Sequence, residues 1–181
     1  PGMVRLAEPL SRCLAAIRAR RDEEGEPPLP LIHLSPQGRP LQQARVRDLA
    51  LGPGAILLCG RYEAIDQRFL DAEVDEEISI GDFVVSGGEL PALLLVDAVI
   101  RLLPGTLNDP ESALADSFSE GLLDHPHYTR PEVLNGEAVP PVLLSGNHRE
   151  IARWRREQAE AATAGKRPDL LAGRADSSRG S

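Results

Sequence analysis

The chain has 181 residues, of which 41% are hydrophobic and 27% charged, enough to bury the core of one domain with a small appendage. Its formal charge of -8 argues against a protein that coats nucleic acid through general basic charge. No apolar run approaches the roughly 18 residues of a membrane-spanning helix. Cys13 and Cys59 are too few for a disulfide scaffold, so we expect reduced thiols and a cytoplasmic protein.

Apolar spacing predicts a first helix over 6–21, which the charged and proline-rich stretch 22–30 ends. A repeated pattern follows, in which a short apolar strand leads through a turn into a helix. Its three instances are strand 31–34, turn 35–38 and helix 41–49; strand 55–59 and helix 65–70; and strand 83–85 and helix 89–103. Continuous apolar strands that alternate with helices are typical of an α/β fold with a parallel sheet covered on both faces.

Charge is distributed unevenly along the chain. Residues 60–120 carry 14 acidic and 3 basic side chains, whereas residues 125–181 carry 7 acidic and 9 basic ones. The polar segment 108–120 is predicted to be a flexible linker that separates a first domain, 1–107, from a helical domain, 121–173. The clearest helix of that second domain covers 149–162, and 174–181 is predicted to be a disordered tail. The change of charge predicts two functional surfaces.

Glycine-bearing loops follow all three predicted strands at the C-terminal edge of the sheet. Open α/β sheets bind their ligands at that edge. The chain contains neither G-x-G-x-x-G nor G-x-x-x-x-G-K-[ST], which disfavours an NAD-type oxidoreductase and a nucleoside-triphosphate site. Glycine turns after strands are more often simple turns, so the pattern alone leaves the ligand open.

Two histidines and one acidic run have the residue types of metal sites. His125 and His127 lack a matching Cys or His pair nearby in sequence, so we expect no metal site there. Asp75-Glu76-Glu77 is interpreted as a solvated acidic turn rather than a cation site. Cys59 ends an apolar strand and is interpreted as a core residue rather than a nucleophile.

Arginines gather on the last clear helix. Arg153, Arg155 and Arg156 form a candidate phosphate-binding face, although Trp154 indicates that the same helix also packs.

Several long strings carry a resemblance to a known family. They are LSPQGRPL (34–41), CGRYEAID (59–66), DEEISIGDFVVSGGELPALLLVDAV (75–99), DSFSEGLLDHPHYTRPEVLNGEAVPPVLLSGNH (116–148) and the Ile-x-x-Trp-Arg run at 151–155. In this order they resemble the bacterial tRNA (guanine-N1)-methyltransferase family, which belongs to the knotted SPOUT methyltransferases. The resemblance extends from Pro1 to about Leu171.

The resemblance implies an S-adenosyl-L-methionine (AdoMet)-dependent enzyme that methylates N1 of guanine at tRNA position 37, next to the anticodon. It also implies a parallel sheet with a deep C-terminal trefoil knot, an exception to the rule against knots, followed by a small helical domain. The implied partners are tRNA and a second copy of the chain, with active sites at the subunit interface; DNA and membranes are not implied. Mg²⁺ is a candidate second cofactor.

The family's cofactor loops map onto four segments of this sequence, within 34–36, 60–63, 78–83 and 85–91. The predicted cofactor-binding residues are Leu34, Ser35, Pro36, Gly60, Arg61, Tyr62, Glu63, Ile80, Gly81, Phe83, Val85, Gly87, Gly88, Leu90 and Pro91.

Three residues are predicted to be catalytic by the same resemblance. Asp116 corresponds to the base that accepts the N1 proton of guanine, a contribution typically worth about 10²–10⁴-fold. Arg101 would stabilise the negative charge that develops on O6, and Glu63 would hold the guanine edge or a magnesium ion. From the residues alone, a helix-terminal cap for Arg101 and a loop cap for Asp116 are the alternatives.

The sequence also departs from the family. His33 and Phe83 stand where tyrosine is common, which predicts altered hydrogen bonds near the cofactor. The chain begins with Pro1, and the family's first strand and a longer C-terminal region have no counterpart, so we interpret it as a fragment or processed product. A fragment that binds AdoMet or tRNA without turnover is therefore the alternative function.

Overall fold

The computed structural model describes residues 3–106 and 116–177, with the side chains of 173–177 left aside. The chain forms two compact units, residues 1–108 and 109–181. The described elements of the first unit are β1 (Val4–Arg5), α1 (Ala7–Glu23), β2 (Leu31–Pro40), α2 (Gln43–Leu51), β3 (Ile56–Cys59), β4 (Ala64–Ile65), α3 (Gln67–Glu73), β5 (Glu76–Ser79) and α4 (Glu89–Ile100). Those of the second unit are β6 (Val133–Leu134), β7 (Glu137–Ala138), α6 (Pro141–Leu144), α7 (His148–Lys166) and α8 (Pro168–Ser177).

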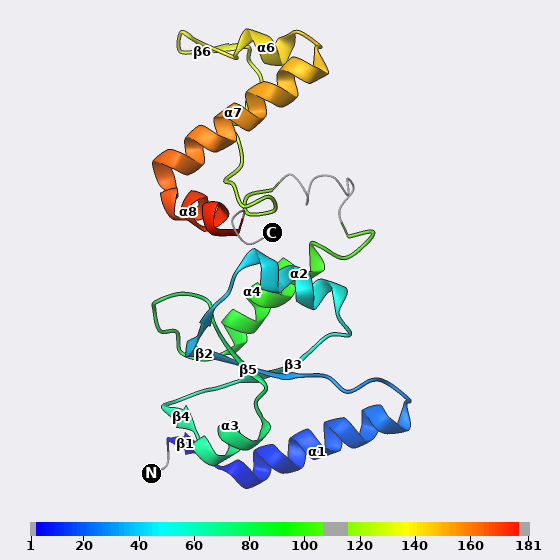
Figure 1. Ribbon diagram of the computed structural model, residues 1–181. Helices are drawn as coiled ribbons and strands as arrows, with labels where there is room; N and C mark the ends of the chain where they lie inside the picture. Colours follow the sequence, from blue (N-terminus) through cyan, green and yellow to red (C-terminus); the bar gives the residue numbers. More distant parts are fainter. Residues whose placement is uncertain (1–2, 107–115, 178–181) are drawn as a thin grey trace. The chain divides into compact units, whose positions relative to one another are not determined.

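The first unit is an α/β layer structure around a parallel sheet, as predicted. Strands are ordered β3-β2-β5, and β2 is parallel to both neighbours. A separate parallel pair joins β1 to β4. Helices α1 and α3 lie on one side of the three-stranded sheet and α2 and α4 on the other (Figure 1).

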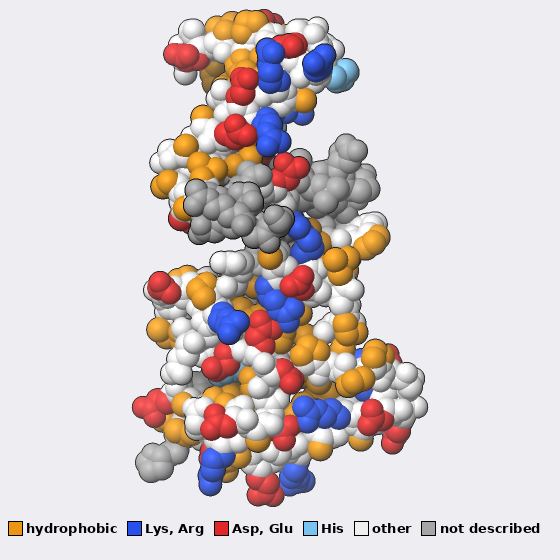
Figure 2. Space-filling view, viewed as in Figure 1, with side chains coloured by type: hydrophobic (Ala, Val, Ile, Leu, Met, Phe, Trp, Pro, Cys, Tyr) orange, Lys and Arg blue, Asp and Glu red, His pale blue; other side chains and the backbone are white. Residues whose placement is uncertain are grey.

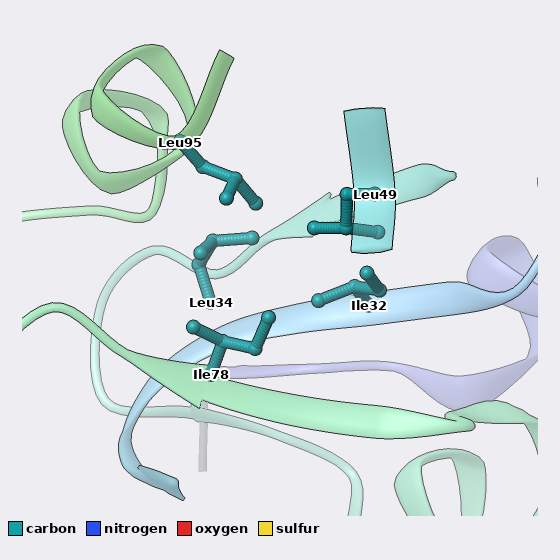
Figure 3. Close-up of a cluster of buried hydrophobic side chains, with 5 residues drawn as sticks. All are labelled: Ile32, Leu34, Leu49, Ile78 and Leu95. Carbon is teal, nitrogen blue, oxygen red and sulfur yellow. The ribbon is translucent and has the colours of Figure 1, made fainter. Parts of the chain in front are cut away.

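Side chains of the central strand β2 alternate between two cores. Ile32 and Leu34 point to one face, where Leu49 of α2, Ile78 of β5 and Leu95 of α4 complete a buried cluster (Figure 3). Leu31 points to the other face and packs in a second buried cluster, whose further members are Leu14, Ile65 and Phe69. Because both faces are buried, β2 reads in the sequence as a continuous apolar run.

The prediction of a third strand at residues 83–85 is wrong. Residues 83–85 form an irregular segment in which Phe83 and Val84 are 56% and 82% exposed. The third strand is instead β5, where Ile78 and Ser79 are buried. The predicted turn 35–38 is also wrong, because β2 continues to Pro40 with a register shift between Leu34 and Arg39.

The acidic run 75–77 is not a solvated turn, because Asp75 directly precedes β5 and Glu76 and Glu77 belong to that strand. A carboxylate oxygen of Asp75 accepts a hydrogen bond from the backbone N–H of Leu31 at 2.7 Å. Glu76 pairs with Arg45 at 2.6 Å, and this hydrogen bond raises the pKa of the guanidinium. These partners satisfy carboxylates that a strand next to the core would otherwise leave unpaired.

Gly38 lies where β2 crosses closest to β5, and no side chain fits there. A Cβ at this position would contact the backbone of Glu77, with its O at 2.6 Å, and the N of Ile78 at 2.5 Å. Overpacking typically costs about 1–3 kcal/mol, so we expect Gly38→Ala to lower the denaturant midpoint of the first unit measurably. Gly165→Ala is the control, because nothing lies within 4 Å of a Cβ in that helix. Equal stability of both variants would contradict the crossing geometry.

The second unit consists mainly of helices. Asn147 is the N-cap of α7, and its side chain accepts a hydrogen bond from the backbone N–H of Glu150; α8 follows after Arg167. Residues 174–177 belong to α8, so the prediction of a disordered tail is wrong at these positions. Residues 178–181, and 108–115 of the predicted linker, lie outside the described residues. Among the described helices, none has the length and apolarity to cross a membrane.

Candidate active site

A cleft lies in the first unit where residues 33–37 of β2 meet the loops after β3 and β5. Residues 33–37, 60–65, 77–81 and 83–88 line it, together with Gln67, Leu70 and Pro91. The loops after β3 and β5 lie at the C-terminal edge of the sheet, where open α/β sheets place ligands. The cleft encloses about 220 Å³, less than the roughly 300–1,000 Å³ of typical ligand sites. A cofactor-sized ligand bound here would therefore extend beyond the cleft's own walls.

Backbone and side-chain contacts fix the loop after β3 against the start of α4. The backbone N–H of Gly88 donates to the carbonyl of Gly60 at 2.8 Å. Arg61 Nε donates to Glu89 Oε1 at 2.7 Å, and this hydrogen bond holds the pKa of Glu89 below its ordinary value. The cleft wall formed by these two segments is thus joined at two places.

One wall residue has an unusual backbone. Tyr62 has a φ of 66°, the left-handed region that non-glycine residues rarely occupy. Its side chain is 72% exposed. Burial of the ring within this unit therefore does not offset the free-energy cost of the strained backbone. Such strained residues concentrate at functional sites, where the surrounding contacts determine their conformation.

A buried polar pair forms part of the cleft floor. His33 is only 8% exposed, and its Nδ1 lies 2.8 Å from Glu77 Oε1. Neither residue was among the predicted site residues, although both line the cleft. The acidic run 75–77 has the pattern of a solvent-exposed turn, so the sequence does not mark Glu77 as a site residue. It marks His33 only as a departure from the family's tyrosine.

Cys59 does not have the environment of a nucleophile. Burial raises the pKa of its thiol, and the nearby carboxylate of Glu89 raises it further. A protonated thiol is a weak nucleophile. This supports the interpretation of Cys59 as a packing residue.

Comparisons with known proteins identify the family. The family model described as tRNA (Guanine-1)-methyltransferase TrmD matches residues 1–173. The chain belongs to the tRNA (guanine-N1)-methyltransferase family. It is 62% identical over 174 residues to the tRNA (guanine-N(1)-)-methyltransferase of Leptothrix cholodnii, with 94% of this chain and 68% of the relative covered.

Other relatives agree. The tRNA (guanine-N(1)-)-methyltransferase of Janthinobacterium sp. is 60% identical, with 94% of this chain and 69% of the relative covered. That of Burkholderia mallei is 59% identical, with 95% of this chain and 65% of the relative covered. The chain therefore spans 65–69% of the length of these relatives. Its functional class is AdoMet-dependent tRNA (guanine-N1) methylation.

The structure brings together 14 of the 15 cofactor residues that the resemblance predicts for a tRNA (guanine-N1)-methyltransferase. All except Leu90 line the single cleft described above. Leu90 is 61% exposed on the first turn of α4 and does not line it.

The predicted catalytic residues lie in different places. Glu63 is exposed and lines the cleft. Arg101 does not line the cleft. It is the C-cap residue of α4, which agrees with the alternative interpretation of this residue as a helix-terminal cap, and its backbone N–H donates to the carbonyl of Asp97 at 3.1 Å. Asp116 is half-buried and begins the described part of the second unit, where its carbonyl accepts from the N–H of Ser119 at 3.2 Å. Their roles stay predictions.

Proposed function

We propose that this chain transfers the methyl group of AdoMet to N1 of guanine 37 of tRNA, with the cleft at the sheet edge as the cofactor site. The observation that carries this proposal is the convergence of 14 predicted cofactor residues on one cleft of a family member; they come from β2, from the loops after β3 and β5, and from the start of α4. Because the substrate is tRNA, the reaction takes place in the cytoplasm.

The shape of the cleft fits a ligand held by main-chain groups. Gly88 approaches the loop after β3 so closely that a Cβ would lie 2.8 Å from Cα of Cys59. Bare backbone of this kind lets N–H and C=O groups reach a ligand directly. AdoMet, when bound, supplies a methyl group that its sulfonium makes electrophilic. The protein then has to orient that methyl group and prepare the nucleophile.

Preparation of the nucleophile falls to side chains. Guanine N1 carries a proton at neutral pH, so a base must accept it as the bond from N1 to the methyl carbon forms. We assign this proton to a carboxylate oxygen of Asp116. Arg101 stabilises the negative charge that moves onto O6. Glu63, at the cleft wall, holds the guanine edge or a Mg²⁺ ion.

The second unit offers arginines for tRNA phosphates. Arg153 and Arg156 on α7 pair with Glu150 and Glu160 on the same helix. Exposed pairs of this kind are worth little, typically about 0–1 kcal/mol, so phosphate oxygens can replace them. Acidic and basic side chains are interspersed on the face shown in Figure 2. Recognition by local arginines and RNA shape therefore suits this chain better than a broad positive field.

The family also implies a deep trefoil knot in the C-terminal part of the first unit, and we extend it to this chain as part of the proposal. The loops that would form it are the cofactor loops of the cleft, so the knot would place three chain segments around one ligand.

A methyl-transfer assay tests the proposal. Purified chain is incubated with AdoMet carrying a labelled methyl group and with transcripts of one tRNA that differ only at position 37. We expect label in guanine-37 tRNA and none when adenine replaces that guanine. Label at another position would overturn the proposed site of methylation.

A second candidate function follows from the length of the chain, which covers 65–69% of the length of its relatives. It is an AdoMet- or tRNA-binding module without turnover. AdoMet binding by calorimetry with no transfer to any transcript would establish this alternative. Binding of NAD in place of AdoMet would overturn both.

We expect the chain to form a homodimer through α4. This helix exposes Leu93 by 63%, Leu94 by 56% and Ile100 by 43%, an apolar surface that its own unit does not cover. The small volume of the cleft is consistent with a site that a second subunit completes. Light scattering should give twice the chain mass for the parent and the monomer mass for Leu94→Glu. Leu51→Glu is the control, since Leu51 is 83% exposed at the end of α2. A monomeric parent at micromolar concentration would contradict the prediction.

A further inference from the structure

Three metal-ligand side chains meet on the second unit, in the segment before β6. Each of Asp124, His125 and His127 offers one ligand atom, and these atoms all lie within 4.8 Å of one another. His127 Nε2 is 2.8 Å from Asp124 Oδ2, and His125 Nε2 is 3.8 Å from Asp124 Oδ1. The sequence shows two histidines without a matching pair, whereas the folded segment adds the carboxylate as a third ligand.

The tautomer of His125 suits a ligand. Its Nδ1 lies 3.0 Å from the backbone carbonyl of Pro126, an acceptor only, so Nδ1 carries the proton and donates. In the neutral ring Nε2 is then unprotonated, with its lone pair on the side of Asp124. A second hydrogen bond that fixes the tautomer is the usual arrangement for metal-binding histidines.

The surroundings hold the cluster in place. The N–H of Asp124 donates to Ser117 Oγ at 2.9 Å, and the N–H of Leu123 donates to Thr163 Oγ1 of α7 at 2.9 Å. The ring of His125 lies edge-on to Trp154 of α7, with centroids 6.5 Å apart.

The distances leave room for an ion. In a tetrahedral site with bonds of about 2.0–2.1 Å, ligand atoms are about 3.4 Å apart. The observed separations of 2.8 Å and 3.8 Å between the histidine nitrogens and the carboxylate oxygens of Asp124 lie on either side of this spacing. His127 Nε2 becomes a ligand once its proton, shared with Asp124, moves to Nδ1 of the same ring. Two imidazole nitrogens and one carboxylate favour zinc-like transition metals over Mg²⁺, which prefers oxygen ligands.

We propose that Asp124, His125 and His127 form a site for one divalent transition-metal ion of the zinc type, with a fourth position open to solvent or to a ligand oxygen. The site is independent of the proposed cofactor cleft and of the Mg²⁺ suggested for Glu63. The ion would link three side chains of residues 124–127 and so rigidify this segment, whose His125 packs against Trp154.

Metal titration tests the proposal on untagged chain that has been stripped with a chelator. Zn²⁺ is titrated by calorimetry and Co²⁺ by visible absorption. We expect one ion per chain with a micromolar or lower Kd, and d–d bands of the intensity that four-coordinate Co²⁺ gives. His127→Gln should weaken binding at least tenfold and is tolerated by the fold, because that side chain is 69% exposed.

Two further variants sharpen the result. His125→Phe keeps a ring against Trp154 but removes the ligand nitrogen, so it should also weaken binding at least tenfold. His148→Gln and Cys13→Ser remove an exposed imidazole and an exposed thiol elsewhere, and should leave the Kd unchanged. Binding no tighter than millimolar in the parent, or equal affinities in parent and His127→Gln, would overturn the site.

Discussion

Asp116→Asn should reduce single-turnover methyl transfer by about 10²-fold or more, since asparagine keeps the size of the side chain but accepts no proton at neutral pH. AdoMet affinity should stay within a few-fold, because the residue acts on guanine and is not one of the residues that line the cleft. Rapid-quench transfer and calorimetry measure the two effects separately.

The matched control is Glu120→Gln, which neutralises an exposed carboxylate four positions further along the same segment. It should transfer at a near-parental rate. Near-normal transfer by Asp116→Asn would move the base elsewhere, and Glu63→Gln would then be the next variant to measure.

The sequence predicts those strands and helices whose buried side chains form a regular apolar pattern. Leu31, Ile32 and Leu34 are buried on two faces, so β2 is visible as an apolar run. The neighbouring strand β3 is also visible as an apolar run, although its residues are only half-buried against the same two cores. The helices follow because their apolar spacing meets those two cores.

Strand β5 is hidden because half of it is glutamate. Glu76 is paired with Arg45 and Glu77 with His33, partners 31 and 44 residues away. Only the folded sheet shows that such carboxylates are compensated, so the pattern reads as solvent-exposed. Conversely, the apolar run 83–85 looks like a strand but belongs to the cleft wall, where Val84 is 82% exposed.

Some features of the candidate site can be predicted from the sequence pattern, and others are visible only in the folded structure. Strand-end glycines predict a ligand edge from topology alone, but the identity of the ligand and of most contact residues came from the resemblance. The His33–Glu77 pair depends on a tertiary contact between residues 44 positions apart. Asp124 is the direct neighbour of His125 in the sequence, but that its carboxylate lies within ligand distance of both histidines is shown only by the folded segment.

Gly88→Ala should weaken AdoMet binding by an order of magnitude or more. The backbone of Gly88 has φ −73° and ψ −7°, which alanine adopts freely, so the effect of the substitution is purely steric. The new Cβ would lie 2.8 Å from Cα of Cys59 and 3.0 Å from N of Gly60, and these backbone atoms have no free direction in which to move. The two cleft segments must separate, and the hydrogen bond from Gly88 to Gly60 is lost.

Gly87→Ala is the matched comparison, one position earlier. Its Cβ would meet the carboxylate end of Glu89 and Cγ of Arg61 at 3.2 Å, both on flexible exposed side chains that can rotate away. We therefore expect less than a threefold change in AdoMet affinity for Gly87→Ala, measured by calorimetry after circular dichroism has shown that both variants are folded. If folded Gly88→Ala binds AdoMet like the parent, the cofactor does not contact this segment. A larger loss for Gly87→Ala than for Gly88→Ala would mean that the Arg61–Glu89 pair, rather than the close backbone approach, controls access to the cleft.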